Sequence, residues 1–384
     1  MATYYIPHQR SSFLPCLLCG ILFCCFTFVY LYAYQADVLA VAQHVLSGGL
    51  TYYDKTIGAI VITFALYMLH QCVFWWSGGA RIGYALTFFP SLLLLAALLD
   101  IDVDNAEHNI CYGSWWLHVP FLLILCFGAL WYLKHKISIK ITQAPYNVCS
   151  QPMWINLLTM AVMFCFVVMS NDQGDVFHYR AKMEQAIYEK RYDEALKVAR
   201  DATVTDENMV MLRAYALSKQ KQLGEHLFEY PLCGGSNALL PNGTNIRLIL
   251  TPQQELYNYI GVSVKQRMGA ITYFSFLYRH HLAKQPLGDY MLCAYLLDKR
   301  LDDFVKWLPV FYNIKGNLPK HYREALVLYN HLRSKPIINY SNDVMDADFK
   351  DYQDMVKNTI KPAVKQSCVR DSYGKTYWYY YQYQ

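Results

Sequence analysis

Charged residues are scarce in the first part of this 384-residue sequence. Across the whole chain 16% of residues are charged, against roughly 25% in an ordinary soluble domain. Residues 1–170 hold only six basic and six acidic residues, although the chain has 34 and 29 in total. No Asp, Glu, Lys or Arg lies between Lys140 and Asp172. Because an uncharged apolar stretch of this length can cross the hydrocarbon core of a bilayer, residues 1–170 are expected to form a membrane unit.

The sequence motifs of common enzyme classes are also absent. There is no P-loop, no G-x-G-x-x-G, no G-x-S-x-G and no H-E-x-x-H, which would indicate nucleotide, dinucleotide, acyl-transfer or zinc-peptidase chemistry. His280 and His281 are adjacent, so they would point to different faces of a helix rather than bind one metal. Convergent active sites need no local motif. Enzymatic activity is therefore left open, with no catalytic residue and no cofactor assigned.

The 12 cysteines do not have the pattern of a disulfide scaffold. Seven lie inside apolar runs, where thiols act as small hydrophobic groups: Cys16, Cys19, Cys24, Cys25, Cys72, Cys126 and Cys165. The Cys16-x-x-Cys19 pair has no His or second pair nearby, which disfavours a metal or redox role. Disulfides among Cys111, Cys233, Cys293 and Cys368 are neither predicted nor excluded.

Five uncharged runs are long enough to span a bilayer. They cover residues of about 13–34, 56–76, 82–99, 114–133 and 153–170. Six of the eight Trp residues fall at the ends of these runs, where amphipathic rings prefer the headgroup region. Pro90 and Pro120 lie inside the third and fourth runs, as kinks that membrane helices tolerate. The sequence therefore predicts an all-α fold that begins with a five-helix transmembrane bundle.

The distribution of basic residues predicts the orientation of this bundle. With the N-terminus inside, the inner segments carry Arg10, Arg81, Lys134, Lys136 and Lys140. The outer loops then carry Lys55 alone, which is the expected positive-inside bias. An odd number of spans places everything after residue 170 outside. The first run could instead be a signal peptide, but its cleavage would leave the later orientation unchanged.

Acidic residues gather in the outer loop at residues 100–113. The predicted metal site consists of Asp100, Asp102, Asp104 and Glu107. Spaced carboxylates suit a hard divalent cation, although Asn105 replaces the turn glycine of a calcium loop and Cys111 replaces its bidentate Glu. The alternative interpretation is a translocated acidic loop that simply obeys the charge rule.

Two histidines lie within the predicted spans, His70 in the second and His118 near the outer end of the fourth. Ionisable groups inside a membrane are functional candidates by default. No acidic or basic partner lies within any of the five runs, so a proton relay has little to act on. Packing against a neighbouring helix is the expected role.

From residue 176 onward the apolar residues recur at helical spacing, and short segments repeat. The repeated segments are IYEKRYDEAL (187–196), KQLGEHLF (221–228), QRMGAITYF (266–274) and LLDKRLDDFV (296–305). If Tyr192, Leu223, Met268 and Leu301 are equivalent, the spacings are 31, 45 and 33. A period near 34 is typical of tetratricopeptide repeats. The sequence predicts tetratricopeptide-like hairpins over 176–333 in a soluble α-solenoid, with a further helix at 318–333 and a Gly/Pro-rich loop insertion at 231–253.

The extension at residues 334–384 ends in the aromatic sequence YGKTYWYYYQYQ. Aromatic side chains at this density are not expected to stay in water. One interpretation is that they cap the solenoid or lie at the membrane interface. The other is that Tyr377, Trp378 and Tyr379 form a partner-binding surface that stacks on a sugar or peptide.

The overall layout, the KRYDEA hairpin and the TYWYYY ending resemble an uncharacterised family of Bacteroidota multi-pass membrane proteins. In that family a membrane bundle precedes tetratricopeptide-like helices. The resemblance implies a Gram-negative inner membrane with the helical tail in the periplasm. It carries no assigned activity.

Three functional hypotheses follow from these patterns. The first is a cell-envelope scaffold or adaptor whose helical repeats bind an envelope protein or peptide. The second is a membrane-embedded enzyme or carrier that acts on a lipid-linked or glycan substrate through the acidic loop 100–108. In the third, the spans only anchor the tail. The net charge of +5 is spread over mixed signs, so no nucleic-acid partner is predicted.

Overall fold

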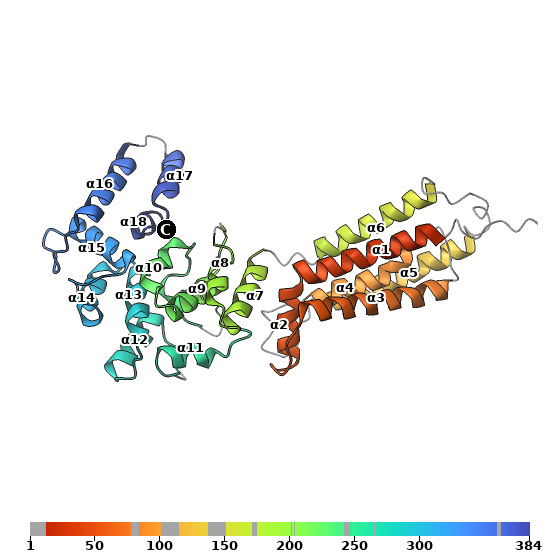
Figure 1. Cartoon of the computed structure of the whole chain (residues 1–384), viewed down its shortest axis with the longest axis horizontal. Helices are drawn as coiled ribbons and strands as arrows, with labels where there is room; N and C mark the ends of the chain where they lie inside the picture. The colour runs from red at the N-terminus through yellow and green to blue at the C-terminus, as the bar shows by residue number, and fades with distance from the viewer. Residues whose placement is uncertain are drawn as a thin grey trace, which may run out of the picture. The chain divides into compact units, whose positions relative to one another are not determined.

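The computed structural model (Figure 1) describes residues 13–77, 84–100, 115–136, 151–170, 175–200, 202, 204–241, 246, 248–264, 266–358 and 362–384. Every regular element in these ranges is a helix. The chain divides into two compact units, Met1–Gly174 and Asp175–Gln384. The predicted all-α class is confirmed at this level.

The first unit is a bundle of apolar helices. Its elements are α1 (Phe13–Val29), the π-turn η2 (Tyr30–Tyr34), α2 (Ala36–Leu46), α3 (Lys55–Ser77), η3 (Ala85–Phe88), α4 (Phe89–Leu99), α5 (Trp115–Lys136) and α6 (Gln151–Ser170). Helix α4 is central: it packs against α3, α5 and α6, and α1 packs against α3 and α6. The short helix α2, between the first and second predicted spans, was not expected from the sequence.

Three helices of this unit are long and apolar enough to cross a membrane: Cys16–Tyr34, Lys55–Ser77 and Met153–Ser170. Their outer faces present large apolar side chains, such as Phe64 at 62% and Leu158 at 68% exposure. Lipid would solvate such a surface, whereas water would not. The apolar helices Ala85–Leu99 and Leu117–Tyr132 are shorter.

The third predicted span, at about residues 82–99, was expected to be one helix kinked at Pro90, but the structure differs. A 3-10 turn starts at Ala85, and the α-helix starts at Phe89 with Pro90 in its first turn. Proline fits there because the N–H it lacks has no partner within the helix at that position. Pro90 therefore begins a helix rather than kinking one. Pro120 does lie inside α5, as expected.

His70 is buried in the bundle against α4 and the turn before it. Its Nε2 lies 3.2 Å from the Tyr84 hydroxyl, and its Nδ1 lies 3.1 Å from Thr87 Oγ1. The imidazole also stacks on Phe88, with 3.5 Å between the ring centroids. The expected packing against a neighbouring helix is confirmed.

The second unit consists of shorter helices. They are α7 (Asp175–Tyr188), α8 (Tyr192–Lys197), α9 (Glu207–Lys219), α10 (Leu223–His226), η5 (Leu227–Glu229), η6 (Gly235–Leu239), α11 (Gln253–Ile260), α12 (Ala270–Arg279), α13 (Leu287–Leu297), α14 (Leu301–Phe311), α15 (Lys320–Leu332), α16 (Asp343–Asn358), α17 (Pro362–Tyr373) and α18 (Tyr377–Tyr383). One hydrophobic core runs from α7 to α18. The extension at 334–384 thus shares the core of the hairpins.

The same turn joins three pairs of helices, α7–α8, α9–α10 and α13–α14. In each turn a lysine adopts the left-handed conformation: Lys190 (φ 61°), Lys221 (φ 59°) and Lys299 (φ 58°). The next residue donates its N–H to a carbonyl in the last turn of the first helix, as in Arg191 N to Ala186 O at 2.8 Å. This pattern is the Schellman cap. It explains why the segments at 187–196, 221–228 and 296–305 resemble one another.

The predicted equivalence therefore holds for Tyr192, Leu223 and Leu301, each of which begins the second helix of a hairpin. It is wrong for Met268, which precedes Gly269, the N-cap residue of α12, and follows no such turn. The fourth cap of this kind ends α12 at His281 (φ 56°) instead. The apparent repeat at 266–274 came from a Gly that caps a helix start.

Candidate binding pocket

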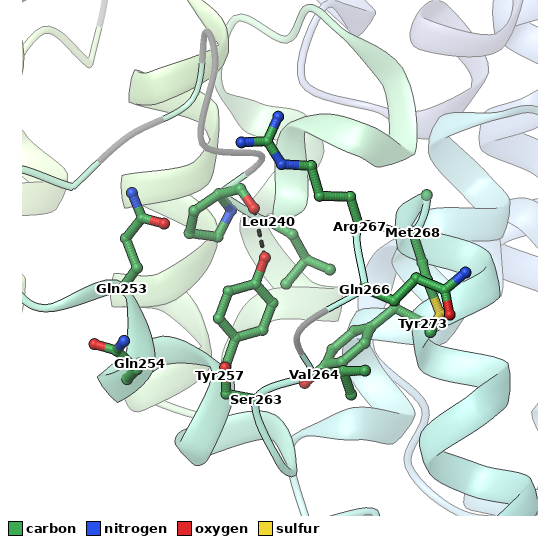
Figure 2. A pocket seen from close by; sticks show the side chains of 12 residues that line it. Leu240, Gln253, Gln254, Tyr257, Ser263, Val264, Gln266, Arg267, Met268 and Tyr273 are labelled. Atoms are coloured by element: carbon green, nitrogen blue, oxygen red, sulfur yellow. Dashed lines mark hydrogen bonds between the residues drawn. The ribbon is translucent and has the colours of Figure 1, made fainter. Parts of the chain in front are cut away.

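A cavity of about 560 Å³ opens in the second unit where α11, the start of α12 and the insertion meet (Figure 2). Leu240 and Pro241 come from the insertion, and Gln253, Gln254 and Tyr257 come from α11. The segment between the two helices supplies Ser263, Val264, Gln266, Arg267, Met268 and Gly269, and α12 supplies Tyr273. Among the described residues, the lining is therefore a mixture of amide, apolar and aromatic groups with one serine hydroxyl and one cation.

Two tyrosines hold the walls of this pocket together. The Tyr257 hydroxyl donates to the Pro241 carbonyl at 2.5 Å, and the Tyr273 hydroxyl donates to the Val262 carbonyl at 2.8 Å. Their rings meet edge to face with centroids 5.4 Å apart, a favourable aromatic arrangement. Burial raises the pKa of both phenols, so the hydroxyls remain protonated and keep donating.

The segment that leads into α11 is fixed by the carboxylate of Glu184, a fully buried residue of α7. One of its oxygens accepts the N–H of Leu250 at 2.7 Å and also the N–H of Ile249. Burial raises the pKa of Glu184, although nearby Arg180 and these N–H groups oppose the change. The carboxyl therefore anchors a segment about 65 residues away in sequence.

The other end of the insertion is fixed to α13 and α12. Asp298 accepts the Ser236 N–H at 2.8 Å and the Ser236 hydroxyl at 2.7 Å. The Asn237 side chain accepts the N–H of Ala270 at 3.1 Å and so caps α12. The described part of the predicted loop insertion at 231–253 contains η6, and its Leu239 and Leu240 enter the core.

We expect Glu184→Gln to alter the pH dependence of stability. The folded-state pKa of Glu184 lies above its ordinary value of 4.5, so the folded state holds the proton more tightly than the unfolded state. Stability from this group is therefore full below pH 4.5 and is lost as pH rises through the folded-state pKa. Glutamine cannot ionise, and its oxygen can still accept the N–H of Leu250.

The measurement is chemical denaturation of the detergent-solubilised chain between pH 4 and pH 8. The variant should lack part of the fall in stability that the wild type shows across this range. Glu194→Gln, at an exposed site of α8, is the control and should keep the wild-type slope. Identical slopes for Glu184→Gln and the wild type would contradict the assignment.

The predicted partner-binding residues lie in the core rather than on the surface. Tyr377, Trp378 and Tyr379 are 0%, 3% and 4% exposed. The Tyr377 and Tyr380 hydroxyls donate to the carbonyls of Leu296 and Leu297 at the end of α13, at 3.2 Å and 2.7 Å. Rings buried in this way cannot stack on a sugar or peptide. Their density in the sequence reflects a capping role.

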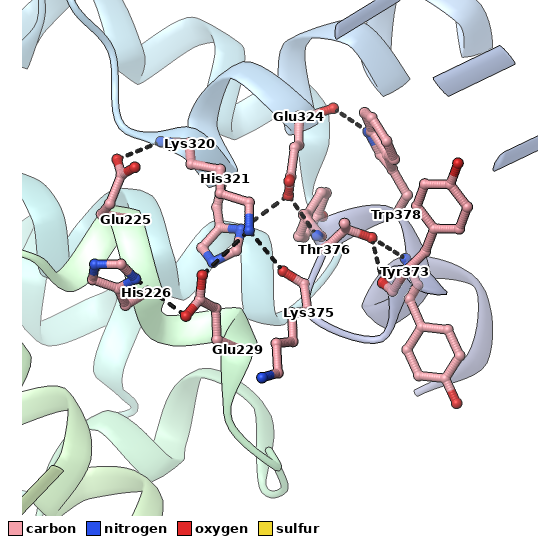
Figure 3. Close-up of polar contacts among 12 residues, drawn as sticks. Glu225, His226, Glu229, Lys320, His321, Glu324, Tyr373, Lys375, Thr376 and Trp378 are labelled. Carbon is pink, nitrogen blue, oxygen red and sulfur yellow. Dashed lines mark hydrogen bonds and ion pairs between the residues drawn. The ribbon is translucent and has the colours of Figure 1, made fainter. Parts of the chain in front are cut away.

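A buried polar pair on α15 holds the same segment (Figure 3). Glu324 Oε2 lies 2.9 Å from His321 Nδ1 and accepts the Tyr377 N–H at 2.7 Å. The backbone carbonyl of Glu324 accepts the Trp378 indole N–H at 2.8 Å. Because both α15 side chains are at most 2% exposed, these bonds are shielded from water and fix α18 on α15.

An ion cluster next to this pair joins η5 to α15 (Figure 3). Lys320 Nζ lies 3.2 Å from Glu229 Oε1 and donates to the Lys375 carbonyl at 3.2 Å. His226 Nδ1 lies 3.2 Å from Glu229 Oε2. Burial acts to raise the pKa of Glu229, but Lys320 and His226 outweigh it, and the pKa is lowered. The contacts of this cluster hold η5 and the backbone at Lys375 against Lys320 of α15.

A model of a family of unknown function, DUF6057, matches residues 104–274 and 264–384. The chain belongs to this family. The matched part contains the whole second unit of this DUF6057 protein, including the pocket. Comparisons with curated proteins and with solved structures found no match.

Most of the predicted metal site of the DUF6057 protein lies outside the described residues. Asp100 follows the end of α4 and is half-buried, whereas Asp102, Asp104 and Glu107 are not described. Across the ranges that are, no group of three or more His, Cys, Asp or Glu could hold a metal ion. Cys233, Cys293 and Cys368 are free thiols, and Cys111 is not described. The metal site stays a prediction.

The pocket was not predicted from the sequence. The one available signal was the Gly/Pro-rich interruption of the hairpin series at 231–253, since such interruptions often carry binding residues. Nothing in the local sequence indicates that Pro241, Tyr257 and Tyr273 lie together. Their proximity comes from the long-range contacts of Glu184 and Asp298.

Proposed function

We propose that this DUF6057 protein is a membrane-anchored binding protein whose second unit holds a segment of a protein or peptide partner in the pocket. The observation that carries this proposal is the cavity of about 560 Å³. Ligand sites usually measure about 300–1,000 Å³ and combine apolar walls with a few polar groups. An adaptor in the cell envelope would need such a site on a rigid helical support.

The membrane half of the proposal is a five-span bundle in a Gram-negative inner membrane. The three long apolar helices support it, and α4 with η3 and α5 would supply the remaining two spans. The inner segments would carry five of the six basic residues of residues 1–170. This orientation places the N-terminus in the cytoplasm and the second unit in the periplasm, as the resemblance to Bacteroidota proteins implies.

The second unit is proposed to be a degenerate tetratricopeptide-like solenoid. Three hairpins with the same Schellman turn support this assignment. Repeats of this type bury their apolar faces against their neighbours and present a continuous surface to a partner. In this chain the insertion and α11 lie within that series, so the pocket is a local modification of a repeat surface.

The chemistry of the lining favours binding over catalysis. Besides two tyrosines that bond to backbone carbonyls, the described lining holds one hydroxyl, that of Ser263, and it includes no His, Asp, Glu or Cys. A serine nucleophile needs a base within hydrogen-bond reach. The groups present can orient and hold a ligand without transferring protons.

Site-specific photo-cross-linking in intact cells tests the proposed function. A benzophenone amino acid replaces Gln254 at the rim of the pocket in the full-length chain. Irradiation should give a cross-linked product of discrete mass that contains a second protein, because a partner segment held in the cavity lies within reach of this position.

The same benzophenone at Lys350, on the exposed face of α16, is the control and should give no such product. Adding Val264→Arg to the Gln254 variant should remove the product, since the larger side chain fills the cavity. Equal cross-linking from both positions, or none from Gln254, would contradict the proposal.

A further inference from the structure

We propose that the partner segment is an extended acidic peptide and that Arg267 binds one of its carboxylates in the pocket. This inference rests on the proposed function and specifies the chemistry of the ligand. Arg267 would recognise the charge of the bound segment, and the glutamine amides of the lining would recognise its backbone.

Charge comes first. Arg267 is the one charged side chain among the described residues that line the cavity, and it is exposed. No described carboxylate forms an ion pair with it. A planar guanidinium can donate two parallel hydrogen bonds to a carboxylate, a geometry that lysine cannot match. Because the described lining includes no Asp or Glu, an acidic ligand would meet no like charge from these residues.

The helix directions reinforce this preference. Gln253 and Gln254 occupy the first turn of α11, and Gly269 is the N-cap residue of α12. The first turn of a helix carries a partial positive charge from N–H groups that have no partner within the helix. The start of α12 and the Arg267 guanidinium therefore contribute positive potential to the cavity, whereas Glu255 in the first turn of α11 offsets part of that helix's contribution.

The amide side chains indicate a peptide backbone. Gln253 and Gln254 lie on one side of Tyr257 in Figure 2, whereas Gln266 and Arg267 lie on the other. Each glutamine amide offers both a donor and an acceptor, which matches the alternating N–H and C=O groups of an extended chain. Val264 and Met268 add apolar contact for a side chain.

A sugar ligand fits these groups less well. Sugars stack on exposed aromatic faces, but Tyr273 is only 3% exposed and packs edge to face against Tyr257. The hydroxyls of both rings already bond to backbone carbonyls. The other polar side chains of the described lining are three amides, the Ser263 hydroxyl and the guanidinium, and amides and a guanidinium are suited to peptide and carboxylate groups.

Fluorescence polarisation with the full-length chain in lipid nanodiscs tests the inference. The probes are three fluorescein-labelled octapeptides with blocked ends and the same Ala, Val and Leu residues, carrying two Glu, two Gln or two Lys. The Glu peptide should bind about tenfold more tightly than the Gln peptide, as expected for a charge-assisted hydrogen bond. The Lys peptide should bind most weakly.

Arg267→Gln should remove the preference, so that the Glu and Gln peptides bind this variant with similar affinity. Arg267→Glu should reverse the preference in favour of the Lys peptide. Arg279→Gln is the matched control, because this exposed arginine ends the same helix that the pocket borders and lies outside the lining. It should keep the wild-type preference.

The outcomes separate this inference from the proposed function. Binding of the Glu and Gln peptides with equal affinity would overturn the acidic preference while supporting a peptide site. Loss of the preference in Arg279→Gln as well as Arg267→Gln would also overturn it, because the effect would then be general electrostatics. Absence of binding by all three peptides overturns the inference, and the cross-link from Gln254 then decides whether the proposed function stands.

Discussion

Trp378→Ala is expected to lower the free energy of unfolding of the second unit by about 3–5 kcal/mol. The indole is 3% exposed and packs against Phe349 and Tyr352, with ring centroids 5.0 Å and 5.9 Å away. Its N–H also donates to the Glu324 carbonyl. Alanine would leave a large cavity and an unpaired carbonyl at the contact between α18 and α15.

Hydrogen exchange of the full-length chain in detergent, followed by mass spectrometry, measures this loss across the second unit. Amides of α15 and α18 should exchange much faster in the variant, and those of α3 in the first unit should not change. Trp307→Ala, at a half-buried site on α14, is the control and should cost less. Wild-type protection of α18 in the Trp378 variant would show that the indole is not needed there.

Glu324→Ala is expected to destabilise the unit by about 2–5 kcal/mol. The substitution leaves the buried Tyr377 N–H and the His321 ring nitrogen without their common acceptor. Each unpaired buried polar group costs about 1–3 kcal/mol. Glu324→Gln should cost less, because its amide oxygen can still accept the Tyr377 N–H.

The denaturant midpoint and the exchange rate of the Tyr377 amide together test this role. Both should change in Glu324→Ala, and the change should be smaller in the glutamine variant. Glu194→Ala removes an exposed ion pair with Arg191 and is expected to have an effect of at most about 1 kcal/mol. Equal effects of Glu324→Ala and Glu194→Ala would contradict a buried anchor at Glu324.

Local sequence was sufficient to predict many of the helices, although not α2, and three of the hairpin turns. Uncharged runs predicted helices α1, α3, α5 and α6 because helix length and apolar character are properties of one contiguous segment. The KRYDEA and DKRLDD segments predicted hairpins because the turn is made by neighbouring residues. Met268 was misassigned because the residues just before the start of a helix can resemble those that follow a turn between two helices. Met268 precedes Gly269, the N-cap residue of α12, and follows no such turn.

The pocket and the role of the aromatic segment could not be predicted in this way. Asp298 and Ser236 are 62 residues apart, and Tyr380 and Leu297 are 83 apart. No spacing rule relates such positions, because their contact depends on how several helices pack. A dense aromatic segment predicts burial or binding equally well, and only its neighbours in space, such as the end of α13, distinguish the two.

The burial of Tyr377, Trp378, Tyr379 and Tyr380 has a consequence for biosynthesis. The hydrophobic core that begins at α7 is closed by these four rings. A nascent chain that has emerged as far as α15 therefore has all its hairpins but still exposes the apolar ends of α13 and α15 to chaperones and proteases. The core of the second unit can therefore be completed only after residues 377–380 have been synthesised, when its other helices are already present.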